Sequence, residues 1–174
     1  MSDAPRPPRI AHARDLLLKD LRKLLTVEEM LTRSMLPKLK QEIKDEQLKS
    51  AVSEHLEQTR EHVTKLQQAF ASLGVTPSGA DAKGLEGLKE ERESTIQDLQ
   101  PSLRDGFNAS AAMGTEHYEI AAYEAAIRVA DACGEEEVAR LLHENLYQEV
   151  DALNKLAEHA TRLAEQGAKQ PAVP

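Results

Sequence analysis

Hydrophobic residues recur every three or four positions along four long stretches of this chain. That spacing places them on one face of an α-helix. The stretches span approximately residues 10–44, 46–73, 102–133 and 135–165. We therefore predict four long helices, each burying one apolar face against its neighbours.

The links between these stretches predict how the helices pack. Short links near Asp45 and Gly134 make the first pair and the last pair antiparallel. The middle link, residues 75–101, can travel much of the length of a bundle, and it contains a pattern for a short fifth helix at about residues 83–98. These features predict an all-α, ferritin-like four-helix bundle with one long crossover. A coiled-coil dimer and a simple up-and-down bundle are the structural alternatives.

One domain, at residues 10–166, accounts for all of the periodic pattern. Residues 1–9 and 167–174 lack it and are predicted to be flexible tails. The first nine residues have no apolar run like that of a signal peptide or membrane anchor. No stretch approaches the ~20 apolar residues of a membrane-spanning helix, so we expect no membrane partner.

Each predicted helix carries polar residues where its buried face would otherwise be apolar. These interruptions are Glu28 in the first helix, His55, Gln58 and His62 in the second, Glu116 and Glu119 in the third, and Glu149 in the fourth. Glu116 and Glu119 are three residues apart, so both face the same side of their helix. Burying like charges together is costly unless a cation neutralises them. The coincidence on all four helices therefore points to one polar layer.

A layer of this composition is typical of a metal site. Four carboxylates and one or two imidazoles can hold two metal ions, as in di-iron and di-manganese bundles. Ligands rich in oxygen and poor in sulfur favour iron or manganese over structural zinc. The predicted metal ligands are Glu28, His62, Glu116, Glu119 and Glu149, with His55 and Gln58 as further members of the layer.

The usual Glu-x-x-His pattern of such bundles is incomplete in this chain. Thr59 stands three residues before His62, and Ala152 stands three residues after Glu149. A buried hydrogen-bonded network without metal is therefore the alternative interpretation of the layer. Tyr123 either donates a hydrogen bond to a ligating carboxylate or simply packs in the core.

Composition excludes several classes of protein. The chain has 30 acidic and 22 basic residues, a net charge of -8 and no long basic run, so nucleic-acid binding is not expected. Cys133 is the single cysteine, which rules out an internal disulfide and fits a reducing, cytoplasmic compartment. The sequence contains no catalytic Ser-His-Asp order, phosphate-binding loop or zinc-type cysteine pair. No catalytic residue is predicted, and whether the protein is an enzyme stays open.

Several segments resemble those of a known family. They are EHLEQTREHV (Glu54–Val63), KGLEGLKEE (Lys83–Glu91), EHYEIAAYE (Glu116–Glu124) and LLHENLYQE (Leu141–Glu149). The chain resembles the YciF-like family of bacterial ferritin-like stress proteins over about residues 16–163. The resemblance implies a ferritin-like bundle, a di-metal site and a link to stress response, and it supplies no defined reaction. It also implies an acidic residue where this chain has Leu153.

Two functions fit these observations. In the first, the protein is a non-haem iron or manganese protein of the oxidative or general stress response, and its partners are metal ions. In the second, it is a non-catalytic helical module whose polar layer binds no metal and fixes helix register and oligomer state. A homodimer is compatible with both.

Overall fold

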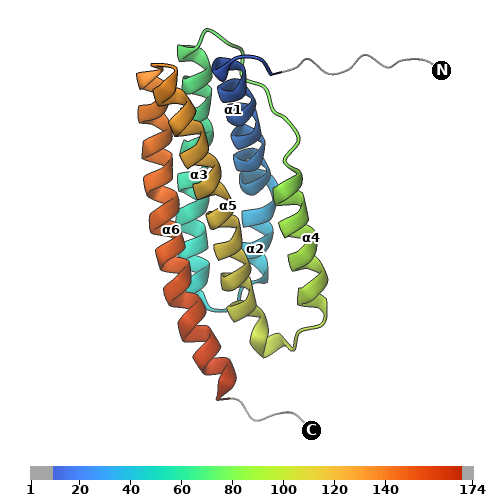
Figure 1. Ribbon diagram of the computed structural model, residues 1–174. Helices are drawn as coiled ribbons and strands as arrows, with labels where there is room; N and C mark the ends of the chain where they lie inside the picture. The colour runs from blue at the N-terminus through green and yellow to red at the C-terminus, as the bar shows by residue number, and fades with distance from the viewer. Residues whose placement is uncertain (1–9, 170–174) are drawn as a thin grey trace, which may run out of the picture.

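The computed structural model describes residues 10–169, which form an antiparallel bundle of four long helical segments with a shorter helix alongside (Figure 1). The elements in chain order are α1 (Ala13–Met30), the π-helical segment η1 (Leu31–Met35), α2 (Leu36–Glu42), α3 (Glu46–Ser72), α4 (Lys83–Gln97), the 3-10 turn η2 (Pro101–Leu103), α5 (Arg104–Ala132) and α6 (Glu136–Ala168). Elements α1, η1 and α2 follow one another without a break and make the first long helix. Residues 10–169 contain no strand. The predicted all-α bundle with a crossover helix is confirmed.

Each long helix packs against two others, in the order α1, α3, α6, α5 around the bundle. The crossover helix α4 packs on α5 and lies beside α2 (Figure 1). Helix α6 runs to Ala168, so it extends into the segment predicted as a tail from residue 167. The rest of the predicted tails, residues 1–9 and 170–174, lies outside the described residues.

Glycines in the left-handed region follow α3 and α5. Gly74 has φ 69° and Gly134 has φ 70°, and this conformation lets the chain leave the helix and reverse direction. The N–H of the residue after each glycine bonds back to the last turn of the helix, at Phe70 and Ala130 respectively. These caps end the helices close to where the sequence predicts.

The first long helix changes its hydrogen-bond pattern just before Pro37. Proline has no N–H to donate to a carbonyl one turn back. The preceding residues form the π-helical segment η1, in which the Leu36 N–H donates to the Leu31 carbonyl five residues earlier. Pro37 thus displaces a hydrogen bond, and the helix continues through it.

The apolar core is divided into two parts by the polar layer. One cluster contains Leu17, Leu21, Leu24, Leu66, Phe70, Ile127, Val138 and Leu142 among others. The second contains Val27, Leu31, Leu36, Ile43, Leu48, Val52, Leu85 and Leu156 among others. Burial of apolar area in both clusters is the main favourable contribution to folding. It must exceed the cost of the polar layer between them.

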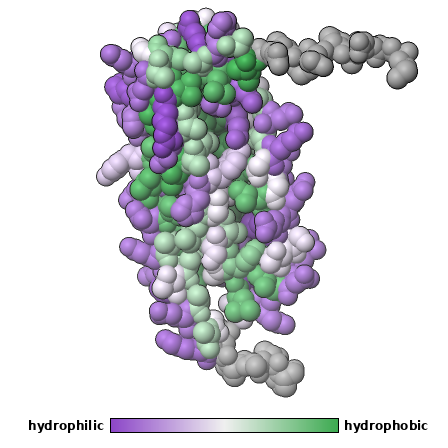
Figure 2. All heavy atoms as spheres, viewed as in Figure 1, coloured by the Kyte–Doolittle hydropathy of each residue, from purple (hydrophilic) through white to green (hydrophobic). Residues whose placement is uncertain are grey.

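The visible surface has the distribution expected of such a bundle. Hydrophilic side chains project from both flanks of the molecule, and hydrophobic groups show mainly along the middle of the face in view (Figure 2). None of the described helices is both long and apolar enough to cross a membrane.

Asp45 ties three elements together at one end of the bundle. Its carboxylate accepts a hydrogen bond from the Leu48 N–H, 2.9 Å away, and so caps the start of α3. It also accepts two hydrogen bonds, of 2.9 and 2.7 Å, from Arg162 of α6. The Asp45 N–H in turn donates to Asp105 of α5. Chiefly through the hydrogen-bonded Arg162, the pKa of Asp45 is lowered to about 2.

We predict that Asp45→Ala lowers the free energy of unfolding by about 1–2 kcal/mol, because the helix loses its N-cap. The pKa of Asp45 is lower in the folded protein than in the unfolded chain. The stabilisation by its carboxylate is therefore present above pH 3.8 and is lost as the pH falls to about 2. Urea unfolding at pH 7 and at acidic pH measures the difference. Glu46→Ala, at the exposed neighbouring position, is the control and should change stability little. An equal effect of the two substitutions would contradict the assignment.

Candidate metal centre

Polar side chains from all four long helices meet between the two apolar clusters. They are Glu28 from α1, His55, Thr59 and His62 from α3, Glu116 and Glu119 from α5, and Asn145 and Glu149 from α6. Each is at most 6% exposed. We call these eight residues the polar layer.

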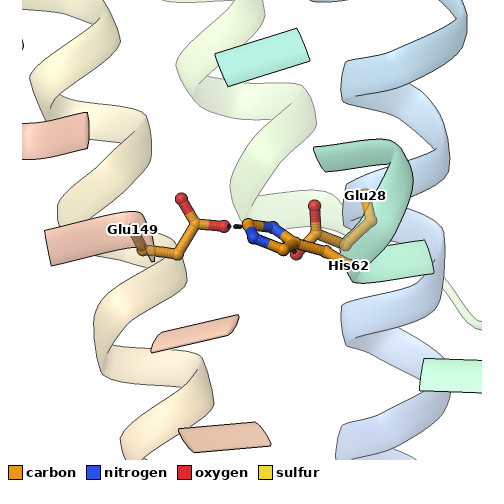
Figure 3. Close-up of side chains that lie close together, drawn as sticks. All are labelled: Glu28, His62 and Glu149. Atoms are coloured by element: carbon orange, nitrogen blue, oxygen red, sulfur yellow. Dashed lines mark ion pairs between the residues drawn. The ribbon is translucent and has the colours of Figure 1, made fainter. Parts of the chain in front are cut away.

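One group in the polar layer is formed by Glu28, His62 and Glu149. His62 Nδ1 lies 2.9 Å from Glu149 Oε1 and 3.4 Å from Glu28 Oε1. Figure 3 shows the His62 ring between the two carboxylates. All three side chains are completely buried, so no bulk water screens their charges.

A second group is formed by His55, Glu116 and Glu149. His55 Nε2 lies 3.3 Å from Glu116 Oε1 and 3.7 Å from Glu149 Oε2. Glu149 is therefore common to both groups, with Oε1 facing His62 and Oε2 facing His55. A carboxylate with one oxygen in each group has the arrangement needed to bridge two ions.

Two of the predicted ligands do not belong to either group. Glu119 is fully buried in the layer, and neither of its carboxylate oxygens has a hydrogen-bond partner. Gln58 is half-buried at the edge of the layer, beside His55. Their role as ligands stays a prediction, as it does for the other five.

A chain of hydrogen bonds holds Glu28 in place. The Tyr123 hydroxyl donates to Glu28 Oε1, and the Asn145 amide donates to the Tyr123 oxygen, 3.1 Å away. The same amide group donates to the His62 carbonyl at 3.3 Å. Of the two sequence-based interpretations of Tyr123, the hydrogen bond to a carboxylate of the layer is the one observed.

The sequence-based prediction missed Asn145 and Gln148. In α6, Asn145 is buried and Leu146 is only partly buried. A step of three after Leu142 selects Asn145 and a step of four selects Leu146, and helical periodicity allows both. Shifting the predicted buried face by one residue would have placed Asn145 on it. A buried side-chain amide needs hydrogen-bond partners, which marks such a residue as a member of a polar layer.

The protonation of His62 is set by its two neighbours. With the Gln148 amide oxygen 2.8 Å from Nε2, Nε2 carries the hydrogen and donates it. In the neutral ring, Nδ1 would then direct a lone pair at the carboxylates of Glu28 and Glu149. Burial alone would lower the pKa of His62, but Glu28 and Glu149 raise it to about 10. A proton or a metal cation at Nδ1 is needed to make this contact favourable.

Three of the four buried carboxylates have raised pKa values, whereas His62 and His55 overcome the effect of burial on Glu149 and lower its pKa to about 2. Burial, followed by the charge of Glu149, raises the pKa values of Glu116 and Glu119 well above the usual range. Burial also raises the pKa of Glu28. In His55, burial lowers the pKa, which favours the neutral ring. In the absence of a cation, protons must therefore neutralise part of the layer.

The donor set fits a metal ion. It consists of carboxylates and imidazoles without sulfur, a combination suited to iron and manganese. Carboxylate oxygens lacking a hydrogen-bond partner are Glu28 Oε2, Glu116 Oε2, and both oxygens of Glu119 and of Glu149. Buried acceptors of this kind are costly unless a cation or proton satisfies them. His62 Nε2 is hydrogen-bonded to Gln148. Metal-binding histidines usually have such a partner on the ring nitrogen that does not bind the metal.

The remaining histidines lie outside this centre. His12, His117 and His143 are exposed, and His159 is half-buried beside Arg162. Within residues 10–169, the two groups that share Glu149 are the only ones with three or more ligand atoms close together. The candidate site is therefore confined to the polar layer.

Comparisons with known proteins match nearly the whole chain. The family described as "Domain of unknown function (DUF892)" matches residues 12–169. Protein YciF of Escherichia coli (strain K12) is 31% identical over 148 residues, which cover 84% of this chain and 89% of that protein. The family match thus includes every described helix and the polar layer.

Solved structures agree with the fold. The crystal structure of the E. coli stress protein YciF has a TM-score of 0.83 and 28% identity, covering 90% of this chain and 99% of that chain. The structure of YcfI from Rhodopseudomonas palustris has a TM-score of 0.84 and 32% identity, covering 87% of this chain and 97% of that chain. Its description proposes a structural role. A protein from Xanthomonas campestris pv. campestris, with a TM-score of 0.73 and 21% identity, shares the fold alone.

We predict that Glu119→Gln stabilises the metal-free protein at pH 8 by on the order of 1 kcal/mol. The folded-state pKa of Glu119 lies above the unfolded value of 4.5, so its stability contribution is full below pH 4.5 and is lost as the pH rises. The neutral amide removes this loss, and the two proteins should therefore be similar at pH 4.5. Urea unfolding in the presence of a chelator measures this difference in the free energy of unfolding. Glu61→Gln on the exposed face of α3 is the matched control, and an equal gain in both variants would contradict the prediction.

Proposed function

This chain belongs to the DUF892 family and is related to the stress protein YciF, and we propose that it is a non-haem iron or manganese protein of the bacterial stress response. Glu28, His62 and Glu149 would hold one divalent ion, and His55, Glu116 and Glu149 would hold a second. With its single cysteine, Cys133, the protein is suited to the reducing cytoplasm.

The observation that carries this proposal is the position of Glu149 between two histidines. Its two oxygens face His62 and His55 at 2.9 and 3.7 Å, and the same ring nitrogen of each histidine also lies near a second carboxylate, Glu28 or Glu116. Two divalent cations would also balance the charge. They carry four positive charges, as many as the negative charges of the four buried glutamates when ionised. Both imidazoles can then be neutral ligands.

Each residue has a distinct role in this arrangement. Glu28 and His62 complete one site, and His55 and Glu116 complete the other. Glu119, with both oxygens free, is available as a further ligand. Tyr123 and Asn145 orient Glu28, and Gln148 fixes the tautomer of His62. When bound, iron or manganese would supply redox chemistry toward peroxide or oxygen.

The second candidate is a structural module without metal. Two observations favour it: several polar groups of the layer already have protein partners, such as Tyr123 with Glu28, and the relative from R. palustris is described with a proposed structural role. In that case the layer would fix helix register, and protons would neutralise its carboxylates.

We predict that iron(II) or manganese(II) stabilises the metal-free protein. A cation that binds only the folded state adds about 2.7 kcal/mol at a hundred times its dissociation constant, or about 5–10 °C in melting temperature for a domain of this size. Thermal melts in chelator-treated buffer near pH 7 measure the shift. Elemental analysis of protein purified from an iron- and manganese-replete source gives the metal content.

The matched control separates the two functions. A Glu116→Ala, Glu149→Ala variant removes ligands of both sites and should not respond to the ions. A Glu124→Ala, Glu158→Ala variant removes the same charge from the outer faces of α5 and α6 and should respond like the parent. A parent whose melting temperature is the same with and without saturating metal would exclude the metal function and leave the structural one.

A further inference from the structure

A cavity of about 150 Å³ lies between the π-helical part of the first helix, the crossover helix α4 and α5. Its lining includes Leu31 and Met35 from η1, Leu88 from α4 and Ala111 from α5. The π turn caused by Pro37 therefore contributes directly to one wall. Such single π turns within α-helices often occur at functional sites.

The inner end of the cavity reaches the polar layer. Thr115 and Glu116 line that end, and Glu116 Oε2 lacks a hydrogen-bond partner. Glu116 also lines a second, smaller cavity of about 20 Å³ on the side of His55. A molecule in the larger cavity would thus lie against the second group of the candidate metal centre.

The mouth of the cavity is basic although the protein is acidic overall. Lys38, Lys89 and Arg92 line it together with one carboxylate, Glu93. Contact with Lys38, and then the charges of the other two cations, lowers the pKa of Glu93. Lys38 is paired with Glu93 at 2.7 Å, and Arg92 is paired with Glu42. Lys89 has no ion pair among the described residues and is half-buried.

Size and lining define the ligand class. A cavity of about 150 Å³ with apolar walls can hold a molecule the size of benzene. An unpaired lysine at the mouth favours a single negative charge there. We propose that this cavity binds a small monoanionic amphiphile, such as a short-chain carboxylate, with its apolar tail between η1, α4 and α5 and its anionic end at Lys89. This binding goes beyond the metal function and does not require metal.

Hexanoate is the probe, tested on the full-length protein in the presence of a chelator. We expect saturable binding with a dissociation constant of about 1 mM or tighter. Hexylammonium has the same tail and the opposite charge and should bind at least tenfold more weakly. NMR of methyl-labelled methionine locates the ligand, because the Met35 signal should shift and the Met30 signal, whose side chain does not line the cavity, should not.

Two variants test the cavity and its mouth separately. Ala111→Leu fills the cavity and should weaken hexanoate binding at least tenfold, whereas Ala125→Leu on the exposed side of the same helix should not. Lys89→Gln should weaken hexanoate binding at least fivefold and leave 1-hexanol binding unchanged. Equal affinity for hexanoate and hexylammonium, or no shift of Met35 at saturation, would overturn the proposal. Because the metal is removed throughout, neither result depends on whether the polar layer binds iron or manganese.

Discussion

Neutralising four buried glutamates is the constraint on which the rest of this structure depends. Glu28, Glu116, Glu119 and Glu149 come from three helices and meet where bulk water does not reach. Burial, followed by repulsion from the charge of Glu149, raises the pKa values of Glu116 and Glu119 well above the usual range. The histidines of α3, His55 and His62, supply only part of the compensation. The remainder must come from protons or from a bound cation.

The two apolar clusters on either side make such a layer tolerable. They bury leucine, valine and isoleucine side chains along nearly the whole length of the bundle, and this burial offsets the unfavourable layer. Packing within the two apolar clusters also fixes the position of each helix along the bundle axis. This brings the polar residues of the four helices to the same position along that axis. When burial of the apolar core offsets the cost, a protein can keep a site that destabilises its fold, and this is common where the site has a function.

Much of this arrangement could be predicted from sequence. Periodicity gave the number, order and approximate ends of the helices, since apolar spacing and glycine caps are local signals. Polar interruptions gave seven candidate members of the layer. Asn145 and Gln148 were missed because steps of three and four along α6 are equally regular, and only packing against α3 and α5 chooses between them. The separation of Glu119 from both groups depends on side-chain direction in three dimensions, which periodicity does not specify.

Anomalous X-ray scattering from crystals soaked in manganese(II) would test the central claim most directly. Two peaks are expected in the polar layer, one on each side of the Glu149 carboxylate, with the first within ligand distance of Glu28 and His62 and the second within ligand distance of His55 and Glu116. Their occupancies should fall in crystals of the Glu116→Ala, Glu149→Ala variant. Manganese bound only at exposed carboxylates, with no peak in the polar layer of the parent protein, would contradict the assignment of this layer as a metal centre.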